Sequence, residues 1–156
     1  MYTPFSLVPK EYMDIPTFFK EWLVRNKNNN KQVIFNGNET YNTVWYSNGQ
    51  IAKQSHFIHT MKQGVWYSWY ENGQMMFEIH YQNNYLQGSY TEWNDDGKIM
   101  ERGIYHKGSK TGLWYEYNKL DHLSSEGHYQ NRRRTGTWEV RNDNGEIVDE
   151  IYFMSH

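Results

Sequence analysis

Three histidines occupy one position of a repeating pattern and could be read as metal ligands. His56, His80 and His128 are separated by 24 and 48 residues, and Glu78 and Glu126 lie two residues before the second and third. Imidazole and carboxylate groups are common zinc ligands. The strands predicted below, however, place His56 two strands from His80, which is about 9.5 Å at about 4.8 Å per strand. One ion with bonds of about 2.1 Å cannot span that gap, so we expect solvated histidines, no metal site and no cofactor.

Four glutamates could supply the paired carboxylates of an acid–base catalyst. They are Glu92, Glu116, Glu126 and Glu150. Such a pair needs a pocket that removes water and shifts the two pKa values, and an open sheet does not offer one. The sequence also has no Ser-His-Asp signature, no HExxH motif and no phosphate-binding glycine loop. We therefore predict that the protein is not an enzyme.

The elements that position these residues repeat every 24 residues. Leading glycines, turn glycines and an aromatic row all keep this period: Gly64, Gly88, Gly112 and Gly136; Gly49, Gly73, Gly97 and Gly145, with Asp121 in the one gap; and Phe57, Tyr81, Tyr105, Tyr129 and Phe153. A fixed period of this length predicts a repeat protein whose units bury their surfaces by stacking on their neighbours.

Each unit has the pattern of a β-hairpin. A strand of about seven residues leads to an Asn-Gly or Asp-Gly turn, and a return strand of about eight residues leads to a polar loop. Earlier, less regular copies begin at Val33. About ten strands in chain order predict an all-β fold, which is a single-layer, twisted antiparallel meander.

The return strands alternate between apolar and polar rows, which separates two faces of the predicted sheet. Met75, Tyr81 and their equivalents share the apolar face, whereas Glu78, Arg102 and Glu126 share the other. The rows are in phase in every repeat, so this assignment holds along the whole sheet.

The forward strands can be placed in two ways. A two-residue Asn72-Gly73 turn puts Trp66 on the apolar face, and a three-residue turn with a bulge puts Trp69 there instead. We favour the two-residue turn, because it gathers the rows that stay apolar on one face.

The N-terminal region differs from the repeats. Asp14 can cap a helix, and an amphipathic stripe runs from there to Arg25, before the polar run 26–32. We expect this short helix to cover the first edge of the sheet, with docking on a partner as the alternative. The chain then divides into a lead-in and capping helix at 1–32 and a repeat sheet at 33–156.

Composition narrows the class of partner. The chain has 156 residues, of which 18% are aromatic, and its net charge is −2. The mean hydropathy is −1.00, which suits a thin sheet with aromatic side chains. This charge predicts no affinity for nucleic acid. The absence of cysteine and of a signal-peptide pattern leads us to expect a cytoplasmic protein.

The units GVWYSWYENGQMMFEIHYQNNYLQ and GSYTEWNDDGKIMERGIYHKGSKT resemble the MORN repeat in its bacterial variant form. The resemblance covers residues 40–153 and implies a binding scaffold. In bacteria it further implies the antitoxins of YwqK-like toxin–antitoxin systems and immunity proteins, with a cognate protein toxin as the partner. Elsewhere, similar repeats imply protein scaffolding or binding to membrane phospholipid, which is our alternative function. The third unit departs from the pattern, because Asp121 replaces its turn glycine.

A partner is expected on the rows that vary between repeats and on the basic rim of the sheet. The predicted binding residues are Trp45, Tyr67, Trp69, Trp93, Arg102, Tyr115, Tyr117, Arg132, Arg133 and Arg134. Aromatic residues and arginine dominate the energetics of protein interfaces. Inhibition would occur by occlusion, and Trp69 or Trp93 should then contribute to binding, whereas Trp114 should contribute to stability.

Overall fold

A computed structural model describes residues 23–26, 31–120 and 122–154 of the chain, and this part is built from twelve β-strands. Their bounds are β1 Leu23–Asn26, β2 Lys31–Asn36, β3 Glu39–Trp45, β4 Ile51–Ile58, β5 Met61–Trp69, β6 Met75–Gln82, β7 Tyr85–Trp93, β8 Ile99–His106, β9 Ser109–Tyr117, β10 Leu123–Gln130, β11 Arg133–Arg141 and β12 Ile147–Phe153.

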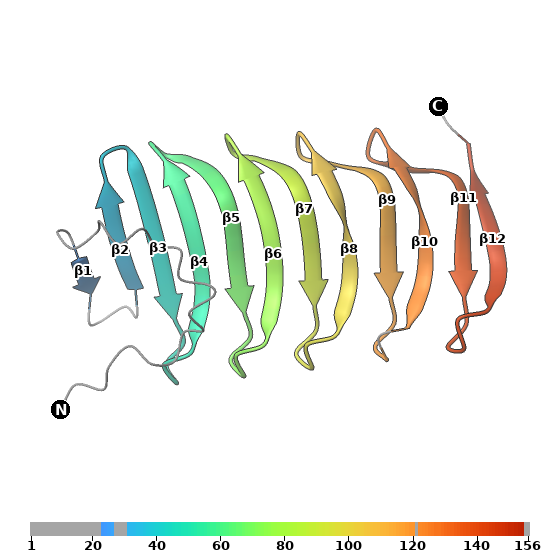
Figure 1. Ribbon diagram of the computed structural model, residues 1–156, viewed down its shortest axis with the longest axis horizontal. Helices are drawn as coiled ribbons and strands as arrows, with labels where there is room; N and C mark the ends of the chain where they lie inside the picture. The colour runs from blue at the N-terminus through green and yellow to red at the C-terminus, as the bar shows by residue number, and fades with distance from the viewer. Residues whose placement is uncertain (1–22, 27–30, 121, 155–156) are drawn as a thin grey trace.

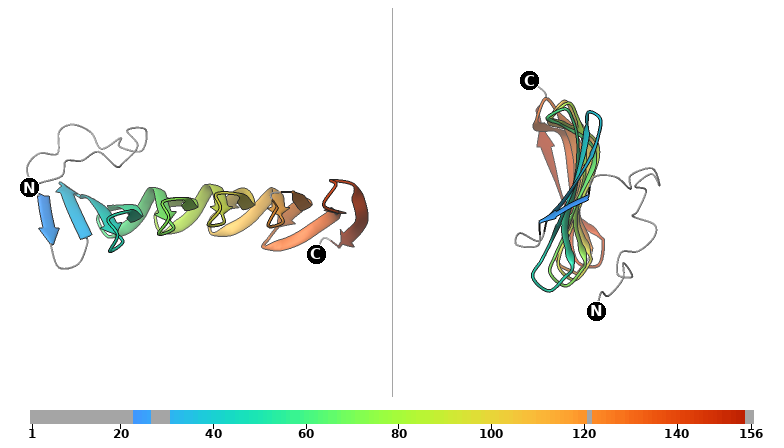
Figure 2. Two further views of the ribbon diagram at one scale, coloured as in Figure 1. Left: turned by 90° about the horizontal axis from the view of Figure 1, so that it is seen from below. Right: turned by 90° about the vertical axis from the view of Figure 1, so that its left-hand side faces the viewer.

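All twelve strands form one sheet, and their order in the sheet is their order in the chain. Every neighbouring pair is antiparallel. Figure 1 shows the strands side by side in a single row, and Figure 2 shows one twisted layer with no second layer over the described strands. The predicted all-β, single-layer meander is confirmed.

The start of the sheet differs from the prediction. Residues before Leu23 lie outside the described residues, and with them most of the helix predicted from Asp14. Its last three positions, Leu23 to Arg25, are wrong, because they lie in β1 and pair with β2. Pairing with the edge of β2 gives these backbone groups partners that a frayed helix end would lack. β2 also begins at Lys31, before the expected Val33, whereas the division of the chain at residue 32 stays a prediction.

The glycine-containing turns have three residues, so the favoured two-residue turn is wrong. The Tyr70 N–H donates to the Gln74 carbonyl at 2.9 Å, and the Gly73 N–H donates to the Tyr70 carbonyl at 2.9 Å. Gly73 has φ of 86°. This is the geometry of a three-residue hairpin loop that ends in a left-handed glycine.

A second irregularity nevertheless preserves the predicted faces. Trp69 pairs with Met75, but Ser68 pairs with Phe77, so Met76 is an extra residue in β6. This β-bulge restores the register beyond the turn, and Trp66 pairs with Ile79 as the two-residue turn would have required.

One row moves to the other face because of the bulge. We predicted Ile51, Met75 and their equivalents on the face of Trp66. They instead lie on the other face, where each pairs with the last residue of the preceding strand. The pairs are Trp45 with Ile51, Trp69 with Met75, Trp93 with Ile99, Tyr117 with Leu123 and Arg141 with Ile147.

The third turn has Asp121 in place of the turn glycine but keeps the asparagine side-chain hydrogen bonds of the glycine-containing turns. The Asn118 Oδ1 accepts hydrogen bonds from the N–H groups of Leu120 and His122, at 2.9 and 3.0 Å. Asn142 forms the same pattern in the last turn. This side-chain acceptor mimics a backbone turn, and it is present whether or not the turn contains a glycine.

Side chains also join the turns that follow Tyr46 and Tyr70 to the next hairpin. The Tyr46 hydroxyl donates to the Trp69 carbonyl at 2.6 Å, and the Tyr70 hydroxyl donates to the Trp93 carbonyl at 2.9 Å. Asn48 donates to the Glu71 carbonyl at 2.8 Å. Neighbouring repeats are therefore connected beyond the backbone ladder of the strands.

The opposite end of the sheet has two-residue turns. Asn131 and Arg132 have φ of 50° and 69°, and the flanking Gln130 and Arg133 pair directly. Such a turn needs φ above zero at both central residues, so Asn-Gly is its preferred sequence. Arg132 is therefore in a backbone conformation that an L-residue with a Cβ atom disfavours.

We expect the substitution Arg132→Gly to raise the free energy of unfolding by about 0.5–1 kcal/mol, because it removes this backbone strain. It also removes the exposed hydrogen bond from Arg132 Nε to Ser109 Oγ, which limits the gain. Urea unfolding would measure the change. Arg133→Gly, at the first strand position, is the control and should lower stability. A less stable Arg132→Gly variant would contradict the expectation.

The core is a line of aromatic rings on one face, which we call the tryptophan face. It contains two interleaved rows, Trp66, Tyr90, Trp114 and Trp138 with Phe57, Tyr81, Tyr105, Tyr129 and Phe153. Trp114 lies 5.1 Å from Tyr105, and Trp138 lies 5.3 Å from Tyr129. Trp114 and Trp138 have no exposed surface, so a single layer buries them by packing within one face.

Two glycines make room for the fully buried rings. A Cβ atom at Gly103 would lie 2.3 Å from Trp114, and one at Gly127 would lie 2.4 Å from Trp138. In the preceding repeat the same position holds Ile79, and its partner is Tyr90 instead of tryptophan. The size of this residue therefore matches the size of the aromatic residue of the next strand.

Candidate binding face

The face opposite the tryptophan face carries most of the predicted binding residues. Cross-strand pairing links Tyr67, Glu78, Thr91, Arg102 and Tyr115 in one row. Paired residues share a face, and residues two apart in a strand share it too. Trp45, Trp69, Trp93 and Tyr117 therefore lie on this face, next to that row. We call the set Trp45, Tyr67, Trp69, Trp93, Arg102, Tyr115 and Tyr117 the candidate face.

Arg102 is the centre of the best-defined contact on the candidate face. Its guanidinium carbon lies 4.7 Å from the ring centroid of Tyr115 and 5.7 Å from that of Tyr117. A cation over an aromatic face is attracted by the ring quadrupole. Further along the sheet, the rings of Tyr67 and Trp69 lie 5.7 Å apart. These contacts hold the side chains in fixed orientations, which lowers the entropy cost of binding a partner.

The residues of the candidate face differ in how far their side chains are exposed to solvent. Trp93, Tyr115 and Tyr117 are partly exposed and Arg102 is exposed. Trp69, in contrast, is only 9% exposed. The role of Trp69 in binding stays a prediction. Its burial beside Met75 and Tyr67 indicates that the ring also contributes to stability.

The sheet becomes acidic towards β12 on this face. Glu126, Glu139 and Glu150 are paired in one row across β10, β11 and β12. Arg141 donates to Glu126 at 2.9 Å and also binds Glu139, whereas Glu150 is exposed at the edge. A partner that covers both regions would need apolar surface over the aromatic residues and positive charge over the acidic end.

The three arginines predicted to form a basic rim, Arg132, Arg133 and Arg134, do not lie together in the structure. Arg132 and Arg133 are exposed at the two-residue turn between β10 and β11. Arg134 does not join them. Its guanidinium lies over Trp138, 4.0 Å from the ring centroid, and donates to Glu116 at 2.6 Å. Arg134 therefore supports the core of the tryptophan face and does not lie on the candidate face.

Sequence reasoning missed the ion pairs of the tryptophan face. Glu92, Glu101 and Glu116 pair across β7, β8 and β9. Like charges in adjacent strands destabilise a sheet, and each glutamate here has a donor. Tyr90 donates to Glu92 at 2.9 Å, Lys110 binds Glu101, and Arg134 binds Glu116. The signal was present in the sequence, because Lys110 and Arg134 share one repeat position.

Tyrosines beside these carboxylates are held in the neutral form. Burial raises the pKa of Tyr105 to about 12, and the Glu101 carboxylate adds to the effect. Burial and then the hydrogen bond to Glu92 raise the pKa of Tyr90. The folded protein therefore resists ionisation of tyrosines that ionise more readily when the chain unfolds.

We expect stability to fall as the pH rises from about 10 to about 12. The pKa of Tyr105 is higher in the folded state than its ordinary value of 10.0, so its contribution is complete below pH about 10 and is lost towards pH about 12. Tyr105→Phe should flatten this part of the stability profile, measured as the urea midpoint against pH. Tyr85→Phe is the matched control. An unchanged slope in Tyr105→Phe would contradict the expectation.

Two of the three histidines in the repeat row, His56 and His80, lie beside different carboxylates. His56 Nε2 lies 3.7 Å from Glu39 and His80 Nε2 lies 3.3 Å from Glu78, both on the side of the sheet that carries the candidate face. Within residues 31–120 and 122–154, no group of three histidine, aspartate or glutamate side chains could hold a metal ion.

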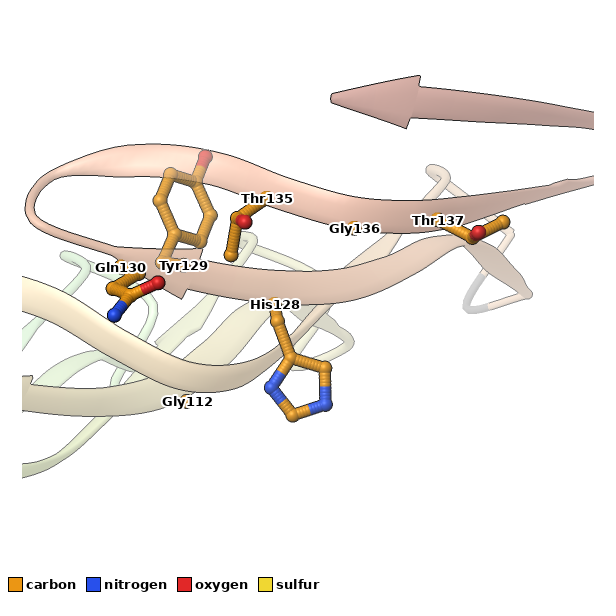
Figure 3. A pocket seen from close by; sticks show the side chains of 7 residues that line it. All are labelled: Gly112, His128, Tyr129, Gln130, Thr135, Gly136 and Thr137. Carbon is orange, nitrogen blue, oxygen red and sulfur yellow. The ribbon is translucent and has the colours of Figure 1, made fainter. Parts of the chain in front are cut away.

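A shallow hollow lies between β9, β10 and β11 (Figure 3). Its lining includes Gly112, Gly136, His128 and Tyr129. The side chains of His128 and Tyr129 point to opposite sides of the strand in Figure 3. They do not converge on one point, as catalytic groups would have to do.

In the part of the chain that the structure describes, there is no helix of the length and hydrophobicity needed to cross a membrane.

Comparison with known families identifies two of the hairpins. Residues 41–59 and 62–83 match the MORN repeat variant. The first match covers most of β3 and all of β4, and the second covers most of β5 and all of β6. The chain thus contains MORN repeat variant units, which suggests a binding role. No curated protein matches the chain.

Proposed function

We propose that this chain of MORN-type hairpins is an antitoxin or immunity protein, which neutralises a cognate protein toxin by covering its functional surface. The observation that carries a binding role is the candidate face, where rigid aromatic residues surround an exposed Arg102. Residues of these types dominate binding at protein interfaces. The toxin as the partner rests on the resemblance of the repeats to YwqK-like antitoxins.

The proposed mechanism is occlusion without chemistry on the toxin. A single-layer sheet presents a broad surface on each face, and its two fully buried side chains, Trp114 and Trp138, lie on the tryptophan face. The opposite rows are free to differ between repeats, from Tyr67 to Thr91 and Tyr115. We further propose that binding takes place in the cytoplasm, that nucleic acid is not a partner, and that no catalysis is involved.

The experiment that tests this function is co-expression with the product of the neighbouring gene. The neighbouring protein should arrest growth when expressed alone, and this chain should restore growth and co-purify with that protein. If no neighbouring protein arrests growth, or if co-expression gives no protection, the antitoxin function is wrong. Binding to anionic lipid vesicles that is lost at high salt and in an Arg132→Glu/Arg133→Glu variant would support the alternative, a phospholipid-binding scaffold.

Within this proposal, Trp93→Ala should weaken toxin binding by about 2 kcal/mol, or about thirtyfold in Kd. Trp93 is partly exposed, so its loss should affect binding more than folding. Titration calorimetry and urea unfolding would separate the two effects. Trp69→Ala should instead lower stability, because Trp69 is 9% exposed.

Phe35→Ala is the matched control for Trp93→Ala. Phe35 is a 53% exposed aromatic residue of β2, outside the candidate face. Equal losses of toxin binding in the two variants would show that the candidate face is not the binding surface.

A further inference from the structure

Three of the junctions between repeats on the tryptophan face share one arrangement, whereas at the junction of β6 and β7 Tyr81 pairs with Leu86 in place of a cation. A return strand presents an aromatic residue, and a cation of the following strand pairs with it, as Phe57 with Lys62, Tyr105 with Lys110 and Tyr129 with Arg134. Four residues after the cation comes the large aromatic residue of the same strand. Lys110 lies 4.1 Å from the ring centroid of Trp114, and Lys62 lies 4.8 Å from that of Trp66.

The residue two positions before the return-strand aromatic completes this junction. Gly103 lies under Trp114 and Gly127 lies under Trp138, whereas the larger Ile79 is paired with Tyr90. A junction thus consists of a small or branched residue and an aromatic residue on one strand. The next strand supplies an aromatic residue and, four positions before it, a cation, or Leu86 in β7.

Strand β12 presents the first half of such a junction with no described strand beside it. β12 is the last strand of the sheet and pairs only with β11. Ile151 holds the position of Ile79 and is 41% exposed. Phe153 holds the position of Tyr105, which contacts the rings of both Tyr90 and Trp114. The Phe153 ring contacts Trp138 and Arg134, and both of these belong to β11.

Charge on β12 indicates what would complete the junction. Asp149 and Glu150 are exposed along this strand, and Glu146 is exposed just before it. In the junction between β8 and β9, the cation Lys110 binds Glu101, which holds the position of Asp149. An acidic edge beside an exposed isoleucine and phenylalanine therefore favours a strand with both a positive charge and an aromatic ring.

We propose that the edge of β12 is a second binding site, which takes up an extended segment of a partner polypeptide as a thirteenth strand. The segment carries Lys or Arg opposite Phe153 and Tyr or Phe four residues later over Ile151. Backbone hydrogen bonds to the edge supply affinity, and the cation and the ring supply specificity. This site is separate from the candidate face and does not depend on a toxin being the partner.

A second copy of the chain lacks such a segment at either end of its described sheet. The strands with a cation four residues before an aromatic residue are β2, β4, β5, β9 and β11, and each has neighbours on both sides. The other edge strand, β1, has the sequence LVRN and no aromatic residue. Pairing β12 with another β12 would bring Asp149 and Glu150 of both copies together, which like-charge repulsion disfavours.

The test uses the full chain and a labelled peptide derived from the internal junctions. The peptide has the sequence of Met61–Trp69, with Trp66→Tyr because Ile151 corresponds to Ile79. Fluorescence anisotropy should show saturable binding. A peptide with Lys62→Glu, and the protein variant Ile151→Lys, should each weaken binding by about tenfold or more. Phe35→Lys, at an exposed site on β2, should leave binding unchanged.

Several outcomes would overturn the proposal. One is the absence of saturable binding to a chain whose circular dichroism shows intact β-structure. Another is binding that Ile151→Lys leaves unchanged, which would place the peptide elsewhere. Sedimentation velocity adds a third, because dimers that disappear in Ile151→Lys would show that the edge pairs with a second copy.

Discussion

Trp114→Ala is expected to lower the free energy of unfolding by about 4 kcal/mol. The side chain has no exposed surface and contacts the rings of Tyr90, Tyr105 and Tyr129. Its Nε1 donates to the Ile104 and Thr111 carbonyls, each at 3.2 Å. Removal of the indole would therefore leave a cavity in the middle of the aromatic line. It would also remove the cation–π contact between Lys110 and the Trp114 ring.

The neighbouring residue provides the control for this prediction. Tyr115 lies next to Trp114 in β9, on the opposite face, and is partly exposed. Tyr115→Ala should cost clearly less stability in the same urea titration. If the two variants are equally stable, the core does not lie on the tryptophan face.

Gly103→Ala is expected to lower the free energy of unfolding by about 3 kcal/mol, although it adds only one methyl group. The added Cβ atom would lie 2.3, 2.4 and 2.7 Å from three atoms of the Trp114 ring system. Those atoms belong to a rigid indole that is packed on both sides, so neither the ring nor the strand can move away without losing contacts. The backbone of Gly103 is not in the left-handed region, so the cost comes from overpacking alone.

A double variant tests whether this cost belongs to the contact between the two residues. The pair Ile79 and Tyr90 occupies the same place one repeat earlier. Gly103→Ala combined with Trp114→Tyr should therefore be more stable than the sum of the two single changes predicts. Strict additivity in thermal or urea unfolding would show that Gly103 acts through something other than the indole.

The sequence alone predicted the repeat, the meander and the two faces, because each depends on periodicity. Side chains alternate with period two, and a period of 24 keeps every row in phase, so Trp66 and Tyr81 were assigned correctly to one face. Such arguments need only the positions of residues along strands.

The turn geometry could not be predicted in the same way. An Asn-Gly sequence is compatible with loops of two or three residues, and the bulge at Met76 cancels the difference in register. The position of Met75 depends on that bulge, and nothing local in the sequence specifies it. The turn was predicted one residue too short and the bulge was not predicted. The effects of these two errors on the register cancel at Trp66, so its face was predicted correctly, but they do not cancel at Met75, whose predicted face was wrong.

The candidate site was predicted in composition but not in arrangement. Arg134 was grouped with Arg132 and Arg133 because the three are adjacent in the sequence. A strand turns adjacent side chains to opposite faces, and Glu116 and Trp138 hold Arg134 on the tryptophan face. The exposure of each aromatic side chain could not be predicted either, because the burial of Trp69, for example, depends on side chains of neighbouring strands.

The linear order of the strands also determines how the protein should open. Each hairpin contacts only the hairpins beside it, so a terminal unit can detach without exposing the middle of the sheet. The hydrogen-exchange rates of backbone amides should therefore form a gradient, fastest in β12 and slowest in the strands around Trp114. Opening would proceed inwards from an end, one hairpin at a time, and a ligand that lies across several hairpins would slow exchange in all of them together.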